Sequence, residues 1–353
     1  MTAPLLSVIL PFYNNAATLD MAVRSVLRQT VTNLELILID DGSTDNSQAL
    51  AQRWKDPRIR LFQNEQNLGV SRTRNRGLDL MRGEFMAPMD ADDRWFRHRL
   101  EWTLQKLREN PALGICGGRA LWKGWSPFPF VCRLPWGPDA VQAYLLYGMP
   151  SPHGSLLFRA SLIRERGARY PEHLKAAVDY DFYRQCAQET GADNVPRVVM
   201  EYHRNPAGIT HTHGRAATAR RLQGLREELL KLLPDGVDED TVRFHARWGN
   251  GTGASDSGDL EAGRAWLEKL ERINAGCRVY SVEGLAKVNG LVWFHCCRNS
   301  AHLGRAAWRA WMDSPWTGHY RPTPSEWFSF AGSGLMAACI PSRRKPQGAL
   351  RGL

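Results

Sequence analysis

The sequence predicts an α/β protein, in which a mostly parallel sheet flanked by helices is followed by a smaller all-α C-terminal region. Over the first 90 residues, short apolar runs alternate with stretches of helical spacing at intervals of about 25 residues, which is typical of βαβ units and a parallel sheet. The apolar runs are continuous, as expected for strands that are covered on both faces. After about residue 213, strand-like runs stop and helical spacing continues.

The elements of the first half follow from their apolar patterns. Residues 7–12, SVILPF, form a short apolar run that is interpreted as a buried strand. Further strands are predicted in the same way at residues 35–40, 58–64, 84–89, 114–118, 154–159 and 197–202. Apolar residues three and four positions apart predict helices at residues 18–29, 47–54, 69–81 and 178–190.

The second half has helical spacing throughout. Its predicted helices lie at residues 216–233, 260–273, 282–297 and 303–311. We therefore predict one domain over residues 1–214, with halves of about 1–110 and 111–214, and a helical C-terminal region with a basic tail over 215–353.

The net charge and the lengths of the apolar runs limit which partners and which cellular compartment are expected. The chain has 46 Lys and Arg against 36 Asp and Glu, a net charge of +10, which can attract nucleic acid, an anionic membrane or phosphorylated substrates. No helix-turn-helix, zinc-finger or RNA-binding signature accompanies this charge, so nucleic acid is not an expected partner. The apolar runs are shorter than the ~20 residues that span a bilayer, and the N-terminus lacks the basic leader of a signal peptide. We expect a cytoplasmic protein with free thiols, open to peripheral contact with the inner membrane face.

A segment rich in Trp, Phe and Pro interrupts the second half of the first domain. It reads LWKGWSPFPFVCRLPWGP, residues 121–138. Two interpretations stay open: a loop or lid with rings facing a substrate, or an aromatic cluster buried under a long loop.

Two of the predicted strands end in acidic residues. Asp40 and Asp41 follow one strand, and Asp90, Asp92 and Asp93 follow another. Because open parallel sheets bind ligands at the carboxyl ends of their strands, we expect both groups at one crevice. The first pair can accept hydrogen bonds from a ribose or a base edge, although its DDGST continuation also fits a capped strand-to-helix turn. The D-x-D pattern offers hard oxygen ligands that suit Mg²⁺ or Mn²⁺ held together with substrate phosphates.

Four stretches in this order resemble the GT-A glycosyltransferases of family 2: SVILPFYNN, LELILIDDGSTDNS, NLGVSRTRNRGL and GEFMAPMDADDRW. The resemblance covers roughly residues 5–210 and implies a Rossmann-like GT-A fold and an inverting transfer from a nucleotide sugar with a divalent cation. It assigns the nucleotide sugar to Pro11, Tyr13, Asp40, Asp41, Arg74, Asn75 and Asp90. It makes Asp92 the metal ligand, with Asp90 beside it, and gives Asp93 a supporting place.

An inverting transfer also needs a base that deprotonates the acceptor hydroxyl. The family supplies it from a Glu-Asp pair, and the corresponding block here is AAVDYDFYRQC, residues 176–186. Val178 stands in the Glu position, so the resemblance implies Asp179 as the base and Asp181 as the second choice. A residue at the start of a helix can also serve only as its cap, and this alternative stays open.

Three histidines complete the candidate site. The block SPHGSLLFR resembles a family segment and implies that His153 lies on the acceptor side, against the alternative of a buried hydrogen-bonding residue. His211 or His213 is a candidate third metal ligand, against the alternative of a surface loop. A processive synthase is not expected, because no Q-x-x-R-W block is present.

We therefore predict a metal-dependent hexosyltransferase that uses Mn²⁺ or Mg²⁺. It would move a sugar from a nucleotide sugar, expected to be a UDP-sugar, to a glycan or lipid-linked acceptor in cell-surface polysaccharide biosynthesis. The alternative is a non-catalytic nucleotide-sugar-binding or scaffold protein of the same fold, which Val178 would explain. A nucleotidyltransferase fits less well, because PFYNNAAT after the first strand contains no Gly-rich phosphate loop. The basic stretch SRRK, residues 342–345, fits acceptor recognition, docking on anionic lipid, or solubility alone.

Overall fold

The strands form as the continuous apolar runs predict. The computed structural model describes residues 4–205, 208 and 212–339, with the backbone alone for 332–339. β2 (Leu34–Asp40) is buried at every position and β1 (Leu6–Phe12) at all but one. Such strands are stable only with helices over both faces of the sheet.

One sheet organises the first unit of the chain, which comprises Met1–Pro138 and Met149–Ala217. Among the described residues the sheet has nine strands in the order β3-β2-β1-β4-β8-β6-β9-β5, with β7 beside β6. Besides β1 and β2, its strands are β3 (Ile59–Gln63), β4 (Phe85–Pro88), β5 (Arg94–Trp95), β6 (Leu113–Lys123), β7 (Phe130–Val131), β8 (Leu157–Arg159) and β9 (Gly191–His203).

The pairing confirms a mostly parallel sheet. β3, β2, β1 and β4 pair in parallel with one another, and β6 pairs in parallel with β9. β8 runs antiparallel to both of its neighbours, as do the short strands β5 and β7 to theirs. The sheet therefore consists of two parallel blocks that are joined through one reversed strand.

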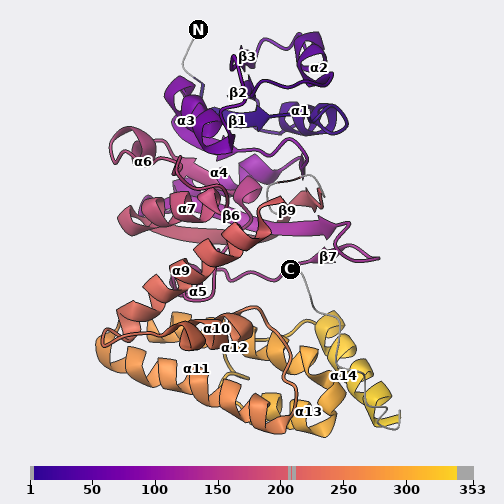
Figure 1. Ribbon diagram of the computed structural model, residues 1–353, viewed down its shortest axis with the longest axis vertical. Helices are drawn as coiled ribbons and strands as arrows, with labels where there is room; N and C mark the ends of the chain where they lie inside the picture. Colours follow the sequence, from indigo (N-terminus) through magenta and orange to yellow (C-terminus); the bar gives the residue numbers. More distant parts are fainter. Residues whose placement is uncertain (1–3, 206–207, 209–211, 340–353) are drawn as a thin grey trace. The chain divides into compact units, whose positions relative to one another are not determined.

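Helices flank this sheet (Figure 1). They are α1 (Leu19–Leu27), α2 (Ser47–Arg53), α3 (Val70–Leu80), α4 (Arg99–Glu109), α6 (Ser161–Arg164), α7 (Val178–Glu189) and the 3₁₀ turn η1 (His153–Ser155). Helix α4 was not predicted, although its buried Leu100, Leu104 and Leu107 have helical spacing.

The second unit, Asp139–Gly148 with Thr218–Leu353, is helical in its described part. Its elements are α5 (Pro138–Tyr144), α9 (Gly214–Leu232), α10 (Glu239–Gly249), α11 (Ser257–Cys277), α12 (Val282–Asn299), η2 (Ala301–Leu303), α13 (Arg305–Met312) and α14 (Pro324–Cys339). Helix α10 begins with a side-chain cap, because Asp238 accepts a hydrogen bond from Thr241 N at 2.7 Å. The helical C-terminal region is thus confirmed, whereas the predicted limit at residue 214 stays a prediction.

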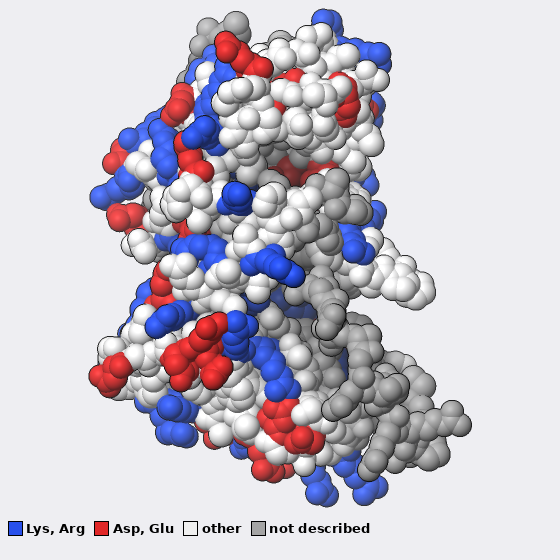
Figure 2. All heavy atoms as spheres, in the orientation of Figure 1, with Lys and Arg blue, Asp and Glu red and all other residues white. Residues whose placement is uncertain are grey.

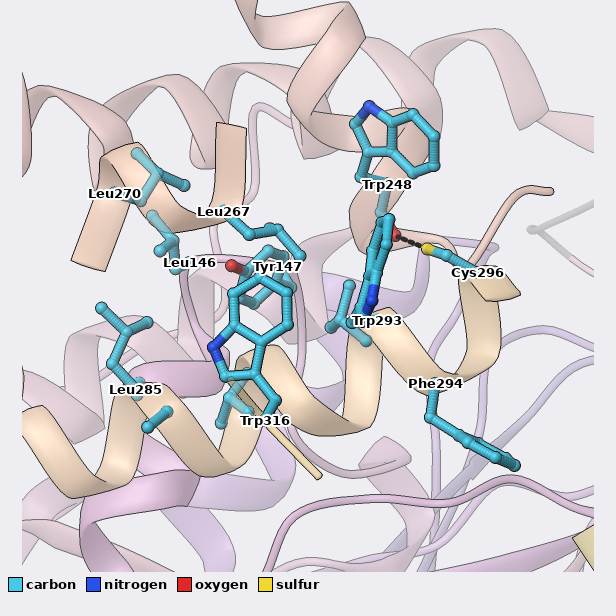
Figure 3. Close-up of a cluster of buried hydrophobic side chains, with 14 of the residues drawn as sticks. Leu146, Tyr147, Trp248, Leu267, Leu270, Leu285, Trp293, Phe294, Cys296 and Trp316 are labelled. Carbon is cyan, nitrogen blue, oxygen red and sulfur yellow. Dashed lines mark hydrogen bonds between the residues drawn. The ribbon is translucent and has the colours of Figure 1, made fainter. Parts of the chain in front are cut away.

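Tryptophans fill the core of this second unit (Figure 3). The ring centroids of Trp248 and Trp293 lie 6.2 Å apart, and those of Trp293 and Trp316 lie 5.9 Å apart. Cys296 Sγ donates to the Trp248 carbonyl at 3.4 Å. Tyr147 belongs to the same core and stacks on His245 with centroids 5.0 Å apart. A short segment from the middle of the chain therefore completes the helical unit, although the sequence placed it within 111–214.

No helix in the described part of the chain is both long enough and apolar enough to cross a membrane.

Candidate functional site

The predicted acidic residues meet at one edge of the sheet. β1 pairs with β2 on one side and with β4 on the other, both in parallel. The residues that follow β2 and β4 therefore lie on the two sides of the C-terminal end of β1. On the face shown in Figure 2, acidic atoms are visible at the bottom of a hollow in the surface of the first unit.

Asp40 and Asp41 differ in how far their oxygens are satisfied. Asp41 Oδ1 accepts from Asn64 Nδ2 at 2.7 Å and from Leu68 N at 2.9 Å, and Asp41 Oδ2 accepts from Gly69 N at 3.0 Å. Asp40 Oδ1 accepts from the Ser43 backbone, whereas its Oδ2 is buried with no partner among the described residues. Asp41 therefore fixes the turn between β3 and α3, and Asp40 keeps one unused acceptor.

The rim beside this pair presents an aromatic ring. Tyr13 follows β1 with 43% of its surface exposed, and Pro11 within β1 is half-buried. Asn14, the residue after Tyr13, connects this rim to the turn after β2, because its Oδ1 accepts a hydrogen bond from Thr44 N at 2.8 Å. A flat exposed ring beside buried acceptors is an arrangement that suits a nucleoside, which offers a π face and hydroxyl donors.

Gly42 allows the neighbouring turn to pack closely. Its φ is +74°, and a Cβ there would lie 2.8 Å from the carbonyl carbon of Gln66. Only glycine meets both requirements.

Arg74 on α3 is the basic residue of the acidic centre. It is buried, and its Nη2 donates to Asp90 Oδ1 at 2.6 Å. Its guanidinium also lies over the ring of Tyr170, 5.3 Å from the centroid. Burial would raise the pKa of Asp90, but the charge of Arg74 and the hydrogen bond that it donates outweigh burial and hold that pKa below its usual value.

The other predicted residue of α3, Asn75, contacts a different segment. Asn75 Nδ2 donates to the Tyr170 carbonyl at 2.9 Å, and Asn75 Oδ1 accepts from Tyr170 N at 2.9 Å. The side-chain amide of Asn75 thus satisfies both backbone hydrogen-bonding groups of residue 170, as a neighbouring strand does in a sheet. In the described contacts, Arg72 reaches Glu172 and Arg76 reaches Asn64, so of these three arginines Arg74 is the one at the acidic centre.

Asp92 and Asp93 carry raised pKa values for related reasons. Burial and the charge of Asp90 raise the pKa of the partly exposed Asp92, whose Oδ2 accepts from Asn205 Nδ2 at 2.9 Å. Burial and the charges of Asp90 and Asp92 raise the pKa of the fully buried Asp93 well above its usual value. Asp93 Oδ1 accepts from His203 N at 3.0 Å, which joins this turn to the end of β9.

The carboxylates of Asp90 and Asp92 fit a divalent cation that is shared with a phosphate. The described residues contain no group of three or more His, Cys, Asp or Glu side chains that could hold a metal alone. Mg²⁺ and Mn²⁺ bind through one or two carboxylates plus substrate phosphates, and Asp90 and Asp92 supply that number. Mutual repulsion raises the pKa of Asp92, and a cation between the two would relieve it. His213 is exposed and contacts Thr212 Oγ1 through its Nδ1, whereas His211 lies outside the described residues.

Asp179 lies within electrostatic reach of this centre. It occupies the first turn of α7, after Ala177 in a left-handed conformation with φ 55°. Burial raises the pKa of Asp179 and the charge of Arg74 lowers it, with a net rise. Asp181 lies in the same first turn. Val178 is almost fully buried, so the position where the family pattern has Glu belongs to the apolar interior here.

His153 is a buried hydrogen-bonding residue, which was the alternative interpretation, and its partner is a tyrosine that no motif indicates. Its Nε2 lies 3.1 Å from the Tyr170 hydroxyl, and the Tyr170 ring stacks on Phe182 of α7 with centroids 4.0 Å apart. Burial lowers the pKa of His153 to about 3, and Arg74 contributes. Tyr170 therefore connects α3, η1 and α7, but a single Tyr in the stretch GARYPEH carries no pattern that would predict this role.

The family model described as "Glycosyl transferase family 2" matches residues 7–134. The putative colanic acid biosynthesis glycosyl transferase WcaA of Escherichia coli K12 is 30% identical over 197 residues, which are 53% of this chain and 68% of that protein. An E. coli UDP-Glc:alpha-D-GlcNAc-diphosphoundecaprenol beta-1,3-glucosyltransferase, WfgD, is 38% identical over 106 residues, 30% of this chain and 42% of that protein.

Two solved structures share the fold. Staphylococcus aureus TarS 1-349 in complex with UDP-GlcNAc superposes with a TM-score of 0.54 at 17% identity, over 88% of this chain and 92% of that one. The mannosyltransferase PcManGT of Pyrobaculum calidifontis, in complex with GDP-Man and Mn²⁺, gives 0.50 at 20% identity, over 96% and 87%.

Proposed function

Because the chain belongs to glycosyltransferase family 2, we propose that it is an inverting hexosyltransferase. It would transfer a sugar from a nucleotide sugar to a hydroxyl group of a glycan or lipid-linked acceptor in cell-surface polysaccharide biosynthesis. One observation carries this proposal: Asp90, Asp92 and Arg74 gather at the carboxyl edge of the sheet, with the partly exposed Asp179 within electrostatic reach.

The donor would bind across the ends of β1 and β2. The exposed ring of Tyr13 would stack on the base, and the unused Oδ2 of Asp40 would accept from the ribose. UDP is the proposed nucleotide, because the relative WfgD is named for UDP-Glc and the TarS structure holds UDP-GlcNAc. The GDP-Man complex of PcManGT makes guanosine the alternative to test.

The diphosphate would lie against Asp92 and Asp90, which would hold Mn²⁺ or Mg²⁺. A bound cation of this kind acts as a Lewis acid that stabilises charge on the leaving diphosphate. Arg74 keeps Asp90 ionised, and Asn205 fixes one oxygen of Asp92. Both contacts orient the carboxylates before the donor arrives, which reduces the reorganisation that binding requires.

Asp179 would take the proton of the acceptor hydroxyl. Its raised pKa suits this role, because a stronger base than an ordinary carboxylate accepts a proton more readily at neutral pH. With Val178 buried in the apolar interior, the acceptor would be positioned without the second carboxylate of the family pattern.

Release of nucleoside diphosphate from a panel of UDP- and GDP-sugars tests the proposal, with and without Mn²⁺. We expect turnover of a UDP-sugar that requires the cation and is lost in Asp92→Ala. Asp179→Asn should retain donor binding in a thermal-shift measurement but lose transfer to acceptor. A non-catalytic nucleotide-sugar-binding protein would instead bind UDP and give the same background rate in wild type and both variants.

A further inference from the structure

An exposed aromatic cluster lies at one hairpin of the first unit. Six large hydrophobic side chains are exposed among the described residues of this unit, and four of them fall within nine positions: Phe128, Phe130, Val131 and Trp136. Phe128 has 80% of its surface exposed and Trp136 has 59%. Phe128, Phe130 and Val131 lie at the tip of the β6–β7 hairpin, whereas Pro135 and Gly137, on either side of Trp136, bond to Asn194 and Asp193 near the start of β9. An exposed apolar tip of this kind on a protein surface usually marks a contact site. We call residues 122–131 the aromatic hairpin.

The aromatic hairpin is a built structure with a defined tip. β7 pairs antiparallel with β6, so that Trp122 lies opposite Phe130. Pro127 and Pro129 flank Phe128, and neither can donate a backbone hydrogen bond to another strand. The tip is therefore a poor edge for adding a strand, which leaves its side chains as the surface that a partner would contact. Figure 1 shows β7 extending away from the rest of the sheet.

The segment that contains the aromatic hairpin carries basic residues and no acidic ones. Residues 110–138 include Arg119, Lys123 and Arg133 and no acidic residue. Lys123 pairs with the buried Glu201 of β9, and Arg204 lies over the Trp125 ring, 5.8 Å from the centroid. Exposed aromatic rings with basic residues at their base are typical of segments that enter the interface of an anionic bilayer.

A row of rings connects the hairpin to the acidic centre. Phe130 stacks on Trp122 with centroids 6.1 Å apart, and Trp122 lies 4.5 Å from the ring of Tyr202. Tyr202 precedes His203, whose backbone N donates to Asp93. The three rings follow the register of three neighbouring strands, β7, β6 and β9. A surface that the hairpin contacts would therefore lie next to the reaction centre of the same unit.

We propose that the aromatic hairpin docks the protein on an anionic membrane surface and so presents a lipid-linked acceptor to the site. The second half of this statement rests on the proposed function, whereas the docking does not. The two exposed rings of the hairpin, Phe128 and Phe130, offer on the order of 250 Å² of apolar surface, well below the ~800 Å² per partner of a stable protein interface. Interfacial membrane binding needs only such a small set of inserted rings, supported by basic residues.

Sedimentation of the full chain with lipid vesicles tests the docking directly. The vesicles are phosphatidylcholine alone or phosphatidylcholine mixed with phosphatidylglycerol, with no donor or acceptor present. We expect partition onto the anionic vesicles, which falls about tenfold or more in Phe128→Ser/Phe130→Ser because both inserted rings are lost. The matched control is Phe328→Ser, which removes an equally exposed phenylalanine (84%) from α14 and should partition like the wild type.

Several outcomes would overturn the proposal. These are no partition by the wild type, equal partition by the hairpin variant, or a loss confined to Phe328→Ser. Hairpin-dependent self-association in light scattering without lipid would assign the surface to a second copy instead. Melting temperature and UDP release with water as acceptor verify that the variants are folded. Melting temperature and UDP release are measured without vesicles, so a failure of the proposed function appears in UDP release and a failure of the docking appears only in sedimentation.

Discussion

The ion pair between Arg74 and Asp90 gives the sharpest quantitative prediction for the first unit. The two side chains are 10% and 26% exposed, and 2.6 Å separates Arg74 Nη2 from Asp90 Oδ1. Arg74→Met keeps much of the volume but leaves a largely buried carboxylate without its cation. Removing one partner of a buried pair costs about 3–5 kcal/mol of unfolding free energy, and the residual exposure of Asp90 places the expected loss near 3 kcal/mol.

The neighbouring Arg72→Met is the matched control. Arg72 and its partner Glu172 are 58% and 47% exposed, and their nitrogen and oxygen lie 3.1 Å apart. Exposed pairs of this kind contribute about 0–1 kcal/mol. Urea unfolding at pH 7 compares the two variants, and the double variant Arg74→Met/Asp90→Asn should recover part of the loss because no unpaired charge is left buried.

The pH dependence of this loss follows from the direction of the pKa shift. The folded-state pKa of Asp90 is lowered, so its ion pair stabilises the protein above the unfolded pKa near 3.9 and is lost as the pH falls through the folded value. In Arg74→Met, burial raises that pKa, so Asp90 destabilises the variant at pH 7 and less so in acid. The gap between wild type and variant should narrow on acidification. An equal loss in Arg74→Met and Arg72→Met, or a gap independent of pH, would refute this reasoning.

Three further predictions concern other parts of the chain. Gly263→Ala should lower the unfolding free energy by about 1–3 kcal/mol, because the added Cβ would lie 2.5 Å from Trp248. The control, Gly276→Ala in the same helix, meets no atom within 4 Å and should raise the unfolding free energy by about 0.5–1 kcal/mol. Thermal unfolding compares the two variants. His153, with its pKa lowered to about 3, should stay neutral in NMR titrations down to pH 5. Its contribution should lower the unfolding free energy as the pH drops below the pKa of about 6.5 that His has in the unfolded chain, and His153→Gln should remove this trend. The acid limb of the transfer rate should report an apparent pKa above that of an ordinary aspartate; transfer by Asp179→Asn at a rate near wild type and with the same acid limb would assign the base elsewhere.

The sequence predicts the first half of the sheet well because its strands are continuous apolar runs. It predicts β9 only as residues 197–202, whereas the strand begins at Gly191. The missing part contains the buried polar residues Asp193 and Asn194. Lys106 pairs with Asp193, and backbone carbonyls of residues 135 and 150 accept from Asn194. These partners come from distant parts of the chain, so no local pattern can show that polar residues are satisfied inside a strand.

The same limit applies to residues 139–148, which the structure groups with the helical unit. The apolar residues of this segment have ordinary helical spacing, but the surface that they cover belongs to helices about 70 or more residues later in the chain. His245 lies 2.6 Å from the Leu146 carbonyl, and Asn289 accepts from the Tyr147 hydroxyl. Periodicity predicts that a face is buried and does not predict which element buries it.

At the site, the sequence predicts which acids gather but not how they differ. Chain topology brings Asp40, Asp41, Asp90 and Asp92 to one edge, and motif spacing is sufficient to expect this. The individual roles depend on neighbours that the motif does not contain. Asn64 and the backbone of residues 68 and 69 saturate Asp41, whereas Asp40 keeps a free acceptor.

The three acids after β4 extend the same argument. Asp90 is held ionised by Arg74 from α3, Asp92 is driven towards its neutral form by burial and by Asp90, and Asp93 more strongly so in full burial. Three identical side chains within four positions therefore have three different affinities for a proton. A cation competes with protons for carboxylate oxygen. It would bind most favourably where one carboxylate is already ionised and where it also relieves the repulsion that raises the pKa of a second carboxylate. Asp90 and Asp92 meet that condition together, whereas Asp93, which is fully buried and tied to β9, is better suited to hold the turn in place.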